Sequence, residues 1–167
     1  MKKNLAGLTT FLFVLLSISG VWAEPTAWLT GAFQINPGGL HRNGASGKMT
    51  LFFEGKDFTS VQLDLDKSVV GETRYLSKEQ VLFEIAKENG SQVTLAYKLE
   101  GPTHRWYFVV IANSTPTIAI QTAYSGTIYK VPAGSLAEVS EKIKNGVDTI
   151  PADWKGVGTV TLASQLF

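Results

Sequence analysis

Hydrophobic and polar residues alternate with a period of two along most of the chain beyond residue 24. The alternation is clearest in residues 58–66, where Val61, Leu63 and Leu65 share one parity and polar residues stand between them. Successive side chains of a strand point to opposite faces, so this period predicts strands with one buried face. The pattern predicts strands over residues 27–35, 48–54, 58–66, 69–76, 80–88, 91–100, 105–112, 117–131 and 157–167.

Turn-forming residues separate these predicted strands. Asn89-Gly90 is the strongest hairpin signal, Gly101-Pro102 marks another turn, and Gly126 marks a bulge or bend within the longest segment. Connections this short favour an antiparallel order in which each strand pairs with the next. We therefore expect an all-β, mainly antiparallel fold of eight or nine strands. A barrel is favoured over a two-sheet sandwich because consecutive short turns suit up-and-down order.

One segment has helical rather than strand periodicity. Ser135 and Glu138 form a capping box, and apolar residues then recur at i, i+3 and i+7, which predicts a short amphipathic helix near residues 136–144. Gly146 stands where a left-handed residue ends such a helix. Residues 105–112 are apolar on both faces, which is typical of a strand buried from two sides.

The first 23 residues have the layout of a secretory signal peptide. Lys2 and Lys3 form a basic start, residues 5–18 are mainly apolar, and Val21 and Ala23 precede the expected cleavage point. The apolar stretch is shorter than the roughly 20 residues that a membrane-spanning helix needs. The sequence therefore predicts a signal peptide at residues 1–23, a single β-rich domain at residues 24–167, and export to the periplasm or the medium of a bacterium.

Charge and cysteine content narrow the range of functions. Removing residues 1–23 takes away two lysines and no acid, which leaves 13 basic and 14 acidic residues and a net charge of −1. A nearly neutral surface does not favour nucleic acid or an anionic membrane. The chain has no cysteine, so a disulfide, a thiol nucleophile and a cysteine metal site are all excluded. No cofactor or metal motif is recognisable.

Catalytic residues form no recognisable constellation in the sequence. His41 and His104 stand in predicted loops far apart along the chain, without metal-ligand spacing. Asp64 and Asp66 share the polar face of one strand, about 7 Å apart by the strand rise, a separation found between paired carboxylates of sugar hydrolases. An enzyme would require at least two of these four residues to meet in one pocket of the folded chain.

Aromatic residues with polar atoms are the best candidates for ligand contact. Trp28 and Tyr107 fall on the parity opposite the expected core, and Trp154 falls in a loop. Such side chains combine a large apolar area with a hydrogen-bonding atom, which suits them to pocket mouths and interfaces. We therefore assign Trp28, Tyr107 and Trp154 as candidate ligand-binding residues.

Two short fragments resemble the avidin family, whose members are eight-stranded biotin-binding barrels. Residues 29–33 (LTGAF) resemble the opening strand, and residues 152–155 (ADWK) resemble the approach to the last strand. The chain then departs from the family, because Asn36-Pro37-Gly38 stands where an avidin has an Asn followed by a Ser. The resemblance implies a barrel, and the biotin site is not carried over.

These features together indicate an exported soluble binding protein without catalytic activity. Because the inward parity is nearly all apolar, a cavity lined by it would suit a small apolar ligand, and a filled interior would leave the surface to a protein partner. Two alternatives stay open, an enzyme whose site is assembled only in three dimensions and a small outer-membrane β-barrel. Against the membrane barrel, the alternate residues counted back from Phe167 are mostly polar.

Overall fold

The structure is a computed structural model that describes residues 26–38, 44–66, 72–86, 91–98, 106–115, 122–144 and 146–164. The strands are β1 (Thr26–Ile35), β2 (Ala45–Glu54), β3 (Asp57–Leu65), β4 (Thr73–Ser77), β5 (Val81–Ala86), β6 (Gln92–Tyr97), β7 (Trp106–Thr115), β8 (Ala123–Pro132) and β9 (Lys155–Ser164). One helix, α1 (Leu136–Ile143), lies between β8 and β9. Residues 1–23, Asn89-Gly90, His41 and His104 lie outside the described residues, so the signal peptide stays a prediction.

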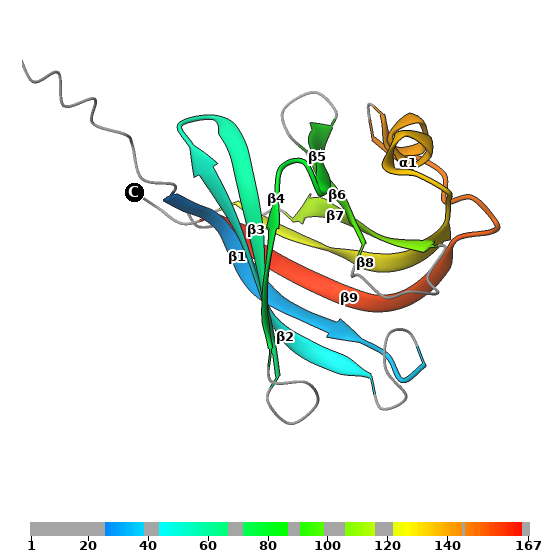
Figure 1. The fold of residues 1–167 in the computed structure, drawn as a ribbon, viewed down its shortest axis with the longest axis horizontal. Coiled ribbons are helices and arrows are strands. Elements are labelled where there is room, and N and C mark those ends of the chain that lie inside the picture. Colours follow the sequence, from blue (N-terminus) through cyan, green and yellow to red (C-terminus); the bar gives the residue numbers. More distant parts are fainter. Residues whose placement is uncertain are drawn as a thin grey trace, which may run out of the picture.

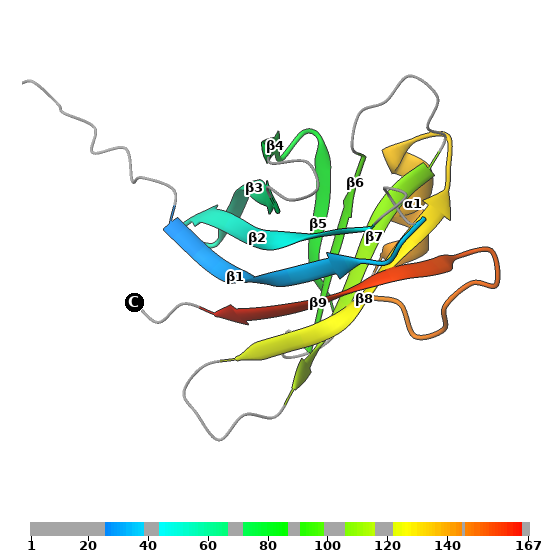
Figure 2. The ribbon, with the colours of Figure 1, turned by 90° about the horizontal axis from the view of Figure 1, so that it is seen from below.

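All the described strands belong to one antiparallel sheet, which curls into a nearly closed barrel (Figure 1). The order is β4-β3-β2-β1-β9-β8-β7-β6-β5, in which every strand except β4 pairs with the next strand of the chain and β9 also pairs with β1. The two edges of the sheet, β4 and β5, are consecutive in the chain. In Figure 2, β5 and β6 cross β1 and β2 at a steep angle. The all-β barrel predicted from the alternation is confirmed.

The inward side chains of the strands form one apolar cluster that fills the barrel. The predicted inward residues of residues 58–66, Val61, Leu63 and Leu65, all belong to it. Each fully buried aliphatic or aromatic side chain of this kind stabilises the fold by about 1.5–3 kcal/mol relative to its exposed form. The largest fully buried members are Tyr97, Phe108, Leu29, Ile35, Met49, Leu51, Leu63, Leu95, Ile128 and Leu162.

Glycines at inward positions let four neighbouring strands approach each other closely. A Cβ built on Gly31 would lie 1.8 Å from the carbonyl oxygen of Thr161 on the paired strand, and one on Gly126 would lie 1.8 Å from that of Ile111. A Cβ built on Gly47 or Gly158 would lie 1.9 or 2.1 Å from a backbone oxygen of the neighbouring strand. Only glycine fits such contacts, and glycines of this kind allow strands to bend at the corners of a barrel. Gly126 therefore marks a bend, since its pairing register continues unbroken.

A second apolar layer lies outside the barrel, where α1 packs against β5 and β6 and its buried side chains join those of β7 (Figure 1). Val139 and Ile143 of the helix are buried against Tyr107, Val109 and Ile111 on the outer face of β7. The inward residues of β7 are buried in the barrel as well. This two-sided burial explains why residues 105–112 are apolar on both faces.

The ends of the helix follow the predicted capping pattern. The Ser135 side chain accepts the N–H of Glu138 at 3.3 Å. The Glu138 carboxylate reaches one residue further than a standard capping box and accepts the N–H of Gly134 at 2.9 Å. It also lies 3.8 Å from the Lys142 ammonium, one turn along. Gly146 has a φ of +91°, the left-handed conformation expected beyond the helix end.

A buried glutamine fastens the segment after the helix to the barrel wall. Gln92 on β6 is 2% exposed, and its side-chain carbonyl accepts the N–H of Val147 at 2.7 Å. Its amide donates to the Val147 carbonyl at 3.2 Å and to Asn113 Oδ1 at 2.9 Å. The buried backbone polar groups of Val147 are thereby paired, which allows this segment to lie against the sheet.

Candidate functional site

The barrel has a seam where backbone pairing stops. β4 has only five residues and pairs with Ser60–Asp64 of β3, so the first residues of β3 extend beyond it. Among the described residues, no strand pairing joins β5 to β3 or to β4. The edge strand β5 instead contacts β3 through side chains.

Phenylalanine rings close this seam. Phe83 on β5 stacks on Phe58 of β3, with ring centroids 4.8 Å apart and planes 17° apart. Phe53 at the end of β2 meets both rings edge-on, at 5.3 Å from Phe83 and 5.7 Å from Phe58. Offset and edge-to-face contacts of this kind add about 0.5–1.5 kcal/mol per pair beyond the burial of area. The barrel is thus closed here by packing rather than by a hydrogen-bond ladder.

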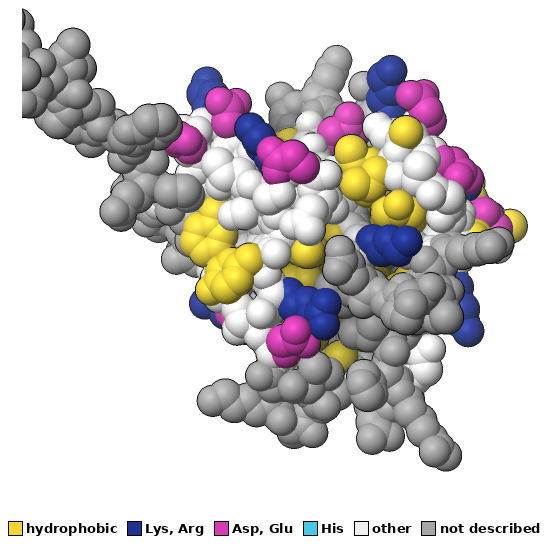
Figure 3. Space-filling model, viewed as in Figure 1, with side chains coloured by type: hydrophobic (Ala, Val, Ile, Leu, Met, Phe, Trp, Pro, Cys, Tyr) yellow, Lys and Arg dark blue, Asp and Glu magenta, His cyan; other side chains and the backbone are white. Residues whose placement is uncertain are grey.

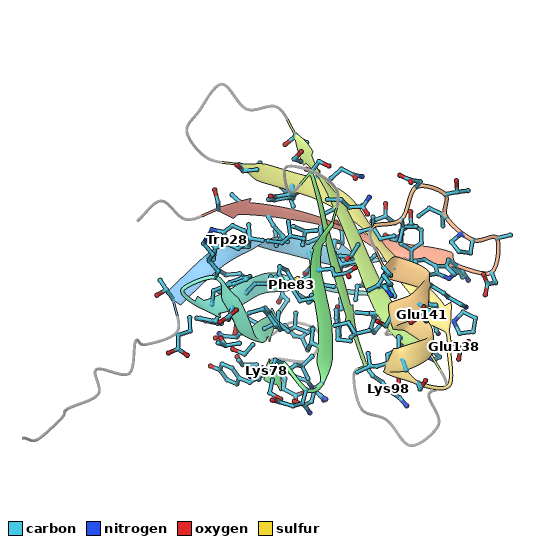
Figure 4. The ribbon with its side chains drawn as sticks, turned by 90° about the horizontal axis from the view of Figure 1, so that it is seen from above. Trp28, Lys78, Phe83, Lys98, Glu138 and Glu141 are labelled. Carbon is cyan, nitrogen blue, oxygen red and sulfur yellow. The ribbon has the colours of Figure 1, made fainter. Side chains whose placement is uncertain are left out.

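An apolar pocket of about 310 Å³ opens beside this aromatic seam. Its walls are Trp28, Phe53 and Ile85, and the β2–β3 turn contributes Gly55 and Lys56. The Trp28 ring meets Phe53 edge-on with centroids 4.8 Å apart. Figure 4 shows Trp28 at the start of β1 and Phe83 on β5, on two sides of this end of the barrel. We call this cavity the mouth pocket.

The sequence of the β2–β3 turn explains the shape of one pocket wall. Glu54 pairs with Asp57, so Gly55 and Lys56 are the two residues of a tight hairpin. Gly55 has a φ of +62°, which a two-residue hairpin turn requires at its first position and which glycine adopts without strain. The turn adds only these two residues to the pocket wall beside Phe53, and Lys56 is exposed at the rim.

Trp28 reaches the mouth pocket because the pairing register shifts at that residue. Ala27 pairs with Phe52 and Leu29 pairs with Leu51, so Trp28 is the additional residue of a β-bulge. The bulge turns its ring toward the inner cluster, against which it packs half-buried. The expected outward parity of Trp28 is therefore wrong, because a simple alternation cannot register an inserted residue.

Tyr107 and Trp154 lie elsewhere, in the layer between the barrel wall and the helix. Tyr107 points outward as its parity predicts, but the outer layer buries it to 7% exposure, with the Lys98 ammonium 5.7 Å from its ring centroid. Trp154 is 6% exposed and packs against Tyr129 at 5.9 Å between centroids. Its indole nitrogen has no hydrogen-bond partner among the described residues. The structure thus brings Tyr107 and Trp154 into one cluster and leaves Trp28 in another.

The two carboxylates considered for catalysis are held by ordinary polar neighbours. Asp64 accepts hydrogen bonds from the Gln62 amide at 2.8 and 2.9 Å and from the Thr73 hydroxyl at 2.8 Å. Asp66 is exposed and accepts the Ser46 hydroxyl at 3.3 Å. Both histidines fall outside the described residues. Within the described ranges, no group of three or more His, Asp or Glu side chains is arranged to hold a metal ion.

The remaining surface differs from the mouth pocket in character. A groove of about 410 Å³ crosses the outer face of β2, β1 and β9, and its exposed lining combines Ala32 with the polar Gln34, Thr159 and Thr161. On the face seen in Figure 3, hydrophobic side chains reach the surface in separate patches among acidic and basic ones.

Inside the barrel, burial raises the pKa of Tyr97 and, to a smaller extent, that of Tyr124.

The sequence pattern assigned none of the seam phenylalanines to a site, and it put Phe58 on the polar face of its strand. It selected aromatics with polar atoms and predicted Phe53, Phe83 and Ile85 to be inward. No local signal identifies them, because the early end of β4 depends on its pairing with β3.

Comparisons of the chain with protein-family models, with curated proteins and with solved structures find no match. No helix in the described ranges combines the length and the apolar character that crossing a membrane requires.

Proposed function

We propose that this chain is an exported binding protein that holds a small apolar ligand, or the apolar part of a larger one, in the mouth pocket. The observation that carries the proposal is the apolar cavity of about 310 Å³ walled by Trp28, Phe53 and Ile85. Small-molecule sites of proteins start at about 300 Å³ and combine apolar walls with a few polar groups. The size suits a single medium-length alkyl chain or one ring system.

The exposure of Ile85 supports a role in binding. Ile85 is 41% exposed, although a large aliphatic side chain on a strand gains about 1.5–3 kcal/mol from full burial. It is one of three large hydrophobic side chains that are this exposed among the described residues, and the others, Tyr75 and Ile150, do not line the mouth pocket. A bound apolar group would remove from water the part of Ile85 that the fold leaves open.

Lys56 supports a preference for ligands with an anionic group. Among the described residues it is the only charged one that lines the pocket, and it is exposed at the rim. An apolar body in the pocket would place a carboxylate or sulfate head within reach of this ammonium. The interaction is worth little at an exposed position, so the apolar walls supply most of the affinity.

The polar outer wall supports a water-facing barrel. Outward positions of β1 and β9 hold Thr30, Gln34, Thr159 and Thr161, where a lipid-facing strand would present apolar residues. Export through the predicted signal peptide would deliver such a barrel to the periplasm or the medium. Detection of a mature chain that begins near Glu24 in the periplasmic fraction would support this part of the proposal, and retention of the unprocessed chain in the cytoplasm would contradict it.

Ligand binding is tested with two probes of equal chain length, dodecanoate and dodecanol. Titration of the mature chain, followed by tryptophan fluorescence and by native mass spectrometry, is expected to show one saturable site for both. The substitution Ile85→Glu places a carboxylate in the apolar wall and should weaken both probes at least tenfold. Ile150→Glu is the matched control, because Ile150 is 37% exposed and lies outside the pocket lining.

Lys56→Met separates the contribution of the charge from that of the apolar walls. We expect this variant to weaken dodecanoate severalfold and to leave dodecanol unchanged. Equal binding by the wild type and Ile85→Glu, or no saturable binding of either probe, would contradict the proposal and direct attention to a protein partner.

A further inference from the structure

The opposite end of the barrel holds a second cavity of different character. It measures about 300 Å³ and is lined by residues 36–38, Lys130 and residues 155–157. It lies where β1 ends and β9 begins, whereas the mouth pocket lies near the start of β1. Of the residues that the structure describes, two lysines line it and no carboxylate does.

The two lysines are direct partners across the β8–β9 ladder. Like charges on facing residues of neighbouring strands destabilise a sheet. Within the described part of the chain, no carboxylate forms an ion pair with either ammonium. The fold therefore carries a local repulsion that a bound anion would relieve.

The Lys130 side chain is held at the cavity by a neighbouring aromatic ring. Its ammonium lies 4.1 Å from the centroid of the Trp106 ring, and the side chain is half-buried. A cation this close to an indole face is attracted by the ring, by about 0.5–2 kcal/mol depending on solvation. Trp106 thus holds one of the two charges at the cavity.

The backbone around the lysines leaves the cavity open. The Asn36 N–H donates to the Val157 carbonyl at 2.7 Å, which fixes the end of β1 against β9. Gly156 lies between Lys155 and Val157 in the chain, and a Cβ on it would have no neighbour closer than 3.6 Å. Close packing therefore does not explain the glycine at this position. A Cβ there would point toward Thr127 and Tyr129, so Gly156 contributes its backbone to the cavity lining.

We infer that this cavity binds a phosphate group carried by a small molecule. Two ammonium groups act as point charges toward a tetrahedral anion, a mode in which lysine is well suited to phosphate. The volume exceeds that of inorganic phosphate and leaves space for a few further atoms, such as a glycerol unit. Free phosphate esters and the headgroups of phospholipids share this chemistry.

The test uses isothermal titration calorimetry of the mature chain with inorganic phosphate and with glycerol 3-phosphate, and sedimentation with vesicles of phosphatidylglycerol. We expect glycerol 3-phosphate to bind more tightly than inorganic phosphate. Binding of free glycerol 3-phosphate would identify a soluble phosphate ester as the ligand. Binding to vesicles alone, lost in the lysine variants, would identify a lipid headgroup.

Lys130→Met and Lys155→Met each keep the apolar stem of the side chain and remove one charge. Each should weaken binding about tenfold or more, the range of a hydrogen bond to a charged group. Lys142→Met is the control, since Lys142 lies on the helix with Glu138 and Asp153 as its partners. Absence of binding to all three probes would overturn the inference, and so would Lys130→Met and Lys155→Met variants that bind as tightly as the wild type.

A stability measurement separates this role from a structural one. Without ligand, Lys155→Met should have a Tm equal to or above that of the wild type at low salt, because it removes a repulsion. Glycerol 3-phosphate should raise the Tm of the wild type and leave that of the variant unchanged. A lower Tm of the variant without ligand, together with no effect of the ester on the wild type, would mean that the lysines serve the fold alone. Neither result depends on the mouth pocket.

Discussion

Replacing Phe83 with alanine tests whether aromatic packing closes the seam of the barrel. Full burial of a phenylalanine contributes about 1.5–3 kcal/mol, and Phe83 is half-buried, so loss of its area costs roughly half of that range. The two ring contacts with Phe53 and Phe58 add about 0.5–1.5 kcal/mol each. We therefore expect Phe83→Ala to lower the free energy of unfolding by about 2–4.5 kcal/mol.

Equilibrium unfolding in urea, followed by tryptophan fluorescence, measures this loss. With a denaturant slope of about 2 kcal/mol per molar urea, the midpoint should fall by about 1–2 M. Tyr75→Ala is the control on the other edge strand, because Tyr75 is 68% exposed and its removal should change stability by less than about 0.5 kcal/mol. Equal midpoints for the two variants would refute the view that these rings hold the seam.

Three further predictions concern other parts of the fold. Gly31→Ala should lower the free energy of unfolding by about 2–3 kcal/mol in the same urea assay, because its Cβ would lie 1.8 Å from the Thr161 carbonyl oxygen. Gly134→Ala is the control: the nearest neighbour of its Cβ is 3.7 Å away, so stability should change by less than about 0.5 kcal/mol. Gln92→Leu should leave the buried N–H and carbonyl of Val147 unpaired, which lowers the free energy of unfolding by about 2–4 kcal/mol and speeds hydrogen exchange at the Val147 amide. Gln34→Leu is the control, because Gln34 is exposed and its replacement should change neither stability nor this exchange rate. Burial raises the pKa of Tyr97 above its ordinary value of 10.0, so its contribution to stability is complete below about pH 10 and is lost as pH rises toward the folded pKa. The fall in stability between about pH 10 and pH 11.5 should therefore be shallower in Tyr97→Phe by up to about 1.4 kcal/mol per pH unit, and identical slopes would contradict this assignment.

Most strands were predictable from the alternation of apolar and polar residues, because burial of one face of a strand imposes a period of two. Val61, Leu63 and Leu65 were predictable for this reason, and so was the helix, whose cap depends on the local pair Ser135 and Glu138. The choice of a barrel depended on short turns between consecutive strands. The closure of β9 on β1 joins residues more than a hundred positions apart, and no local pattern encodes it.

The candidate site was only partly predictable. Trp28 was selected for its chemistry, and it does line the mouth pocket, but the bulge that turns it there arises from a register shift against β2. Tyr107 was correctly placed on the outer face, yet the helix that covers it comes later in the chain. Phe58 and Phe83 form a site only because β4 ends early, and strand length is set by tertiary pairing.

Nuclear magnetic resonance with isotope-labelled isoleucine methyl groups tests the central claim most directly. Titration with dodecanol should shift the methyl signal of Ile85 and produce nuclear Overhauser effects between the alkyl chain and both Ile85 and the Trp28 ring, and the signal of Ile150 should stay in place. Shifts confined to residues around the helix, or no change at Ile85 up to the solubility limit of dodecanol, would contradict the assignment of the mouth pocket as an apolar ligand site.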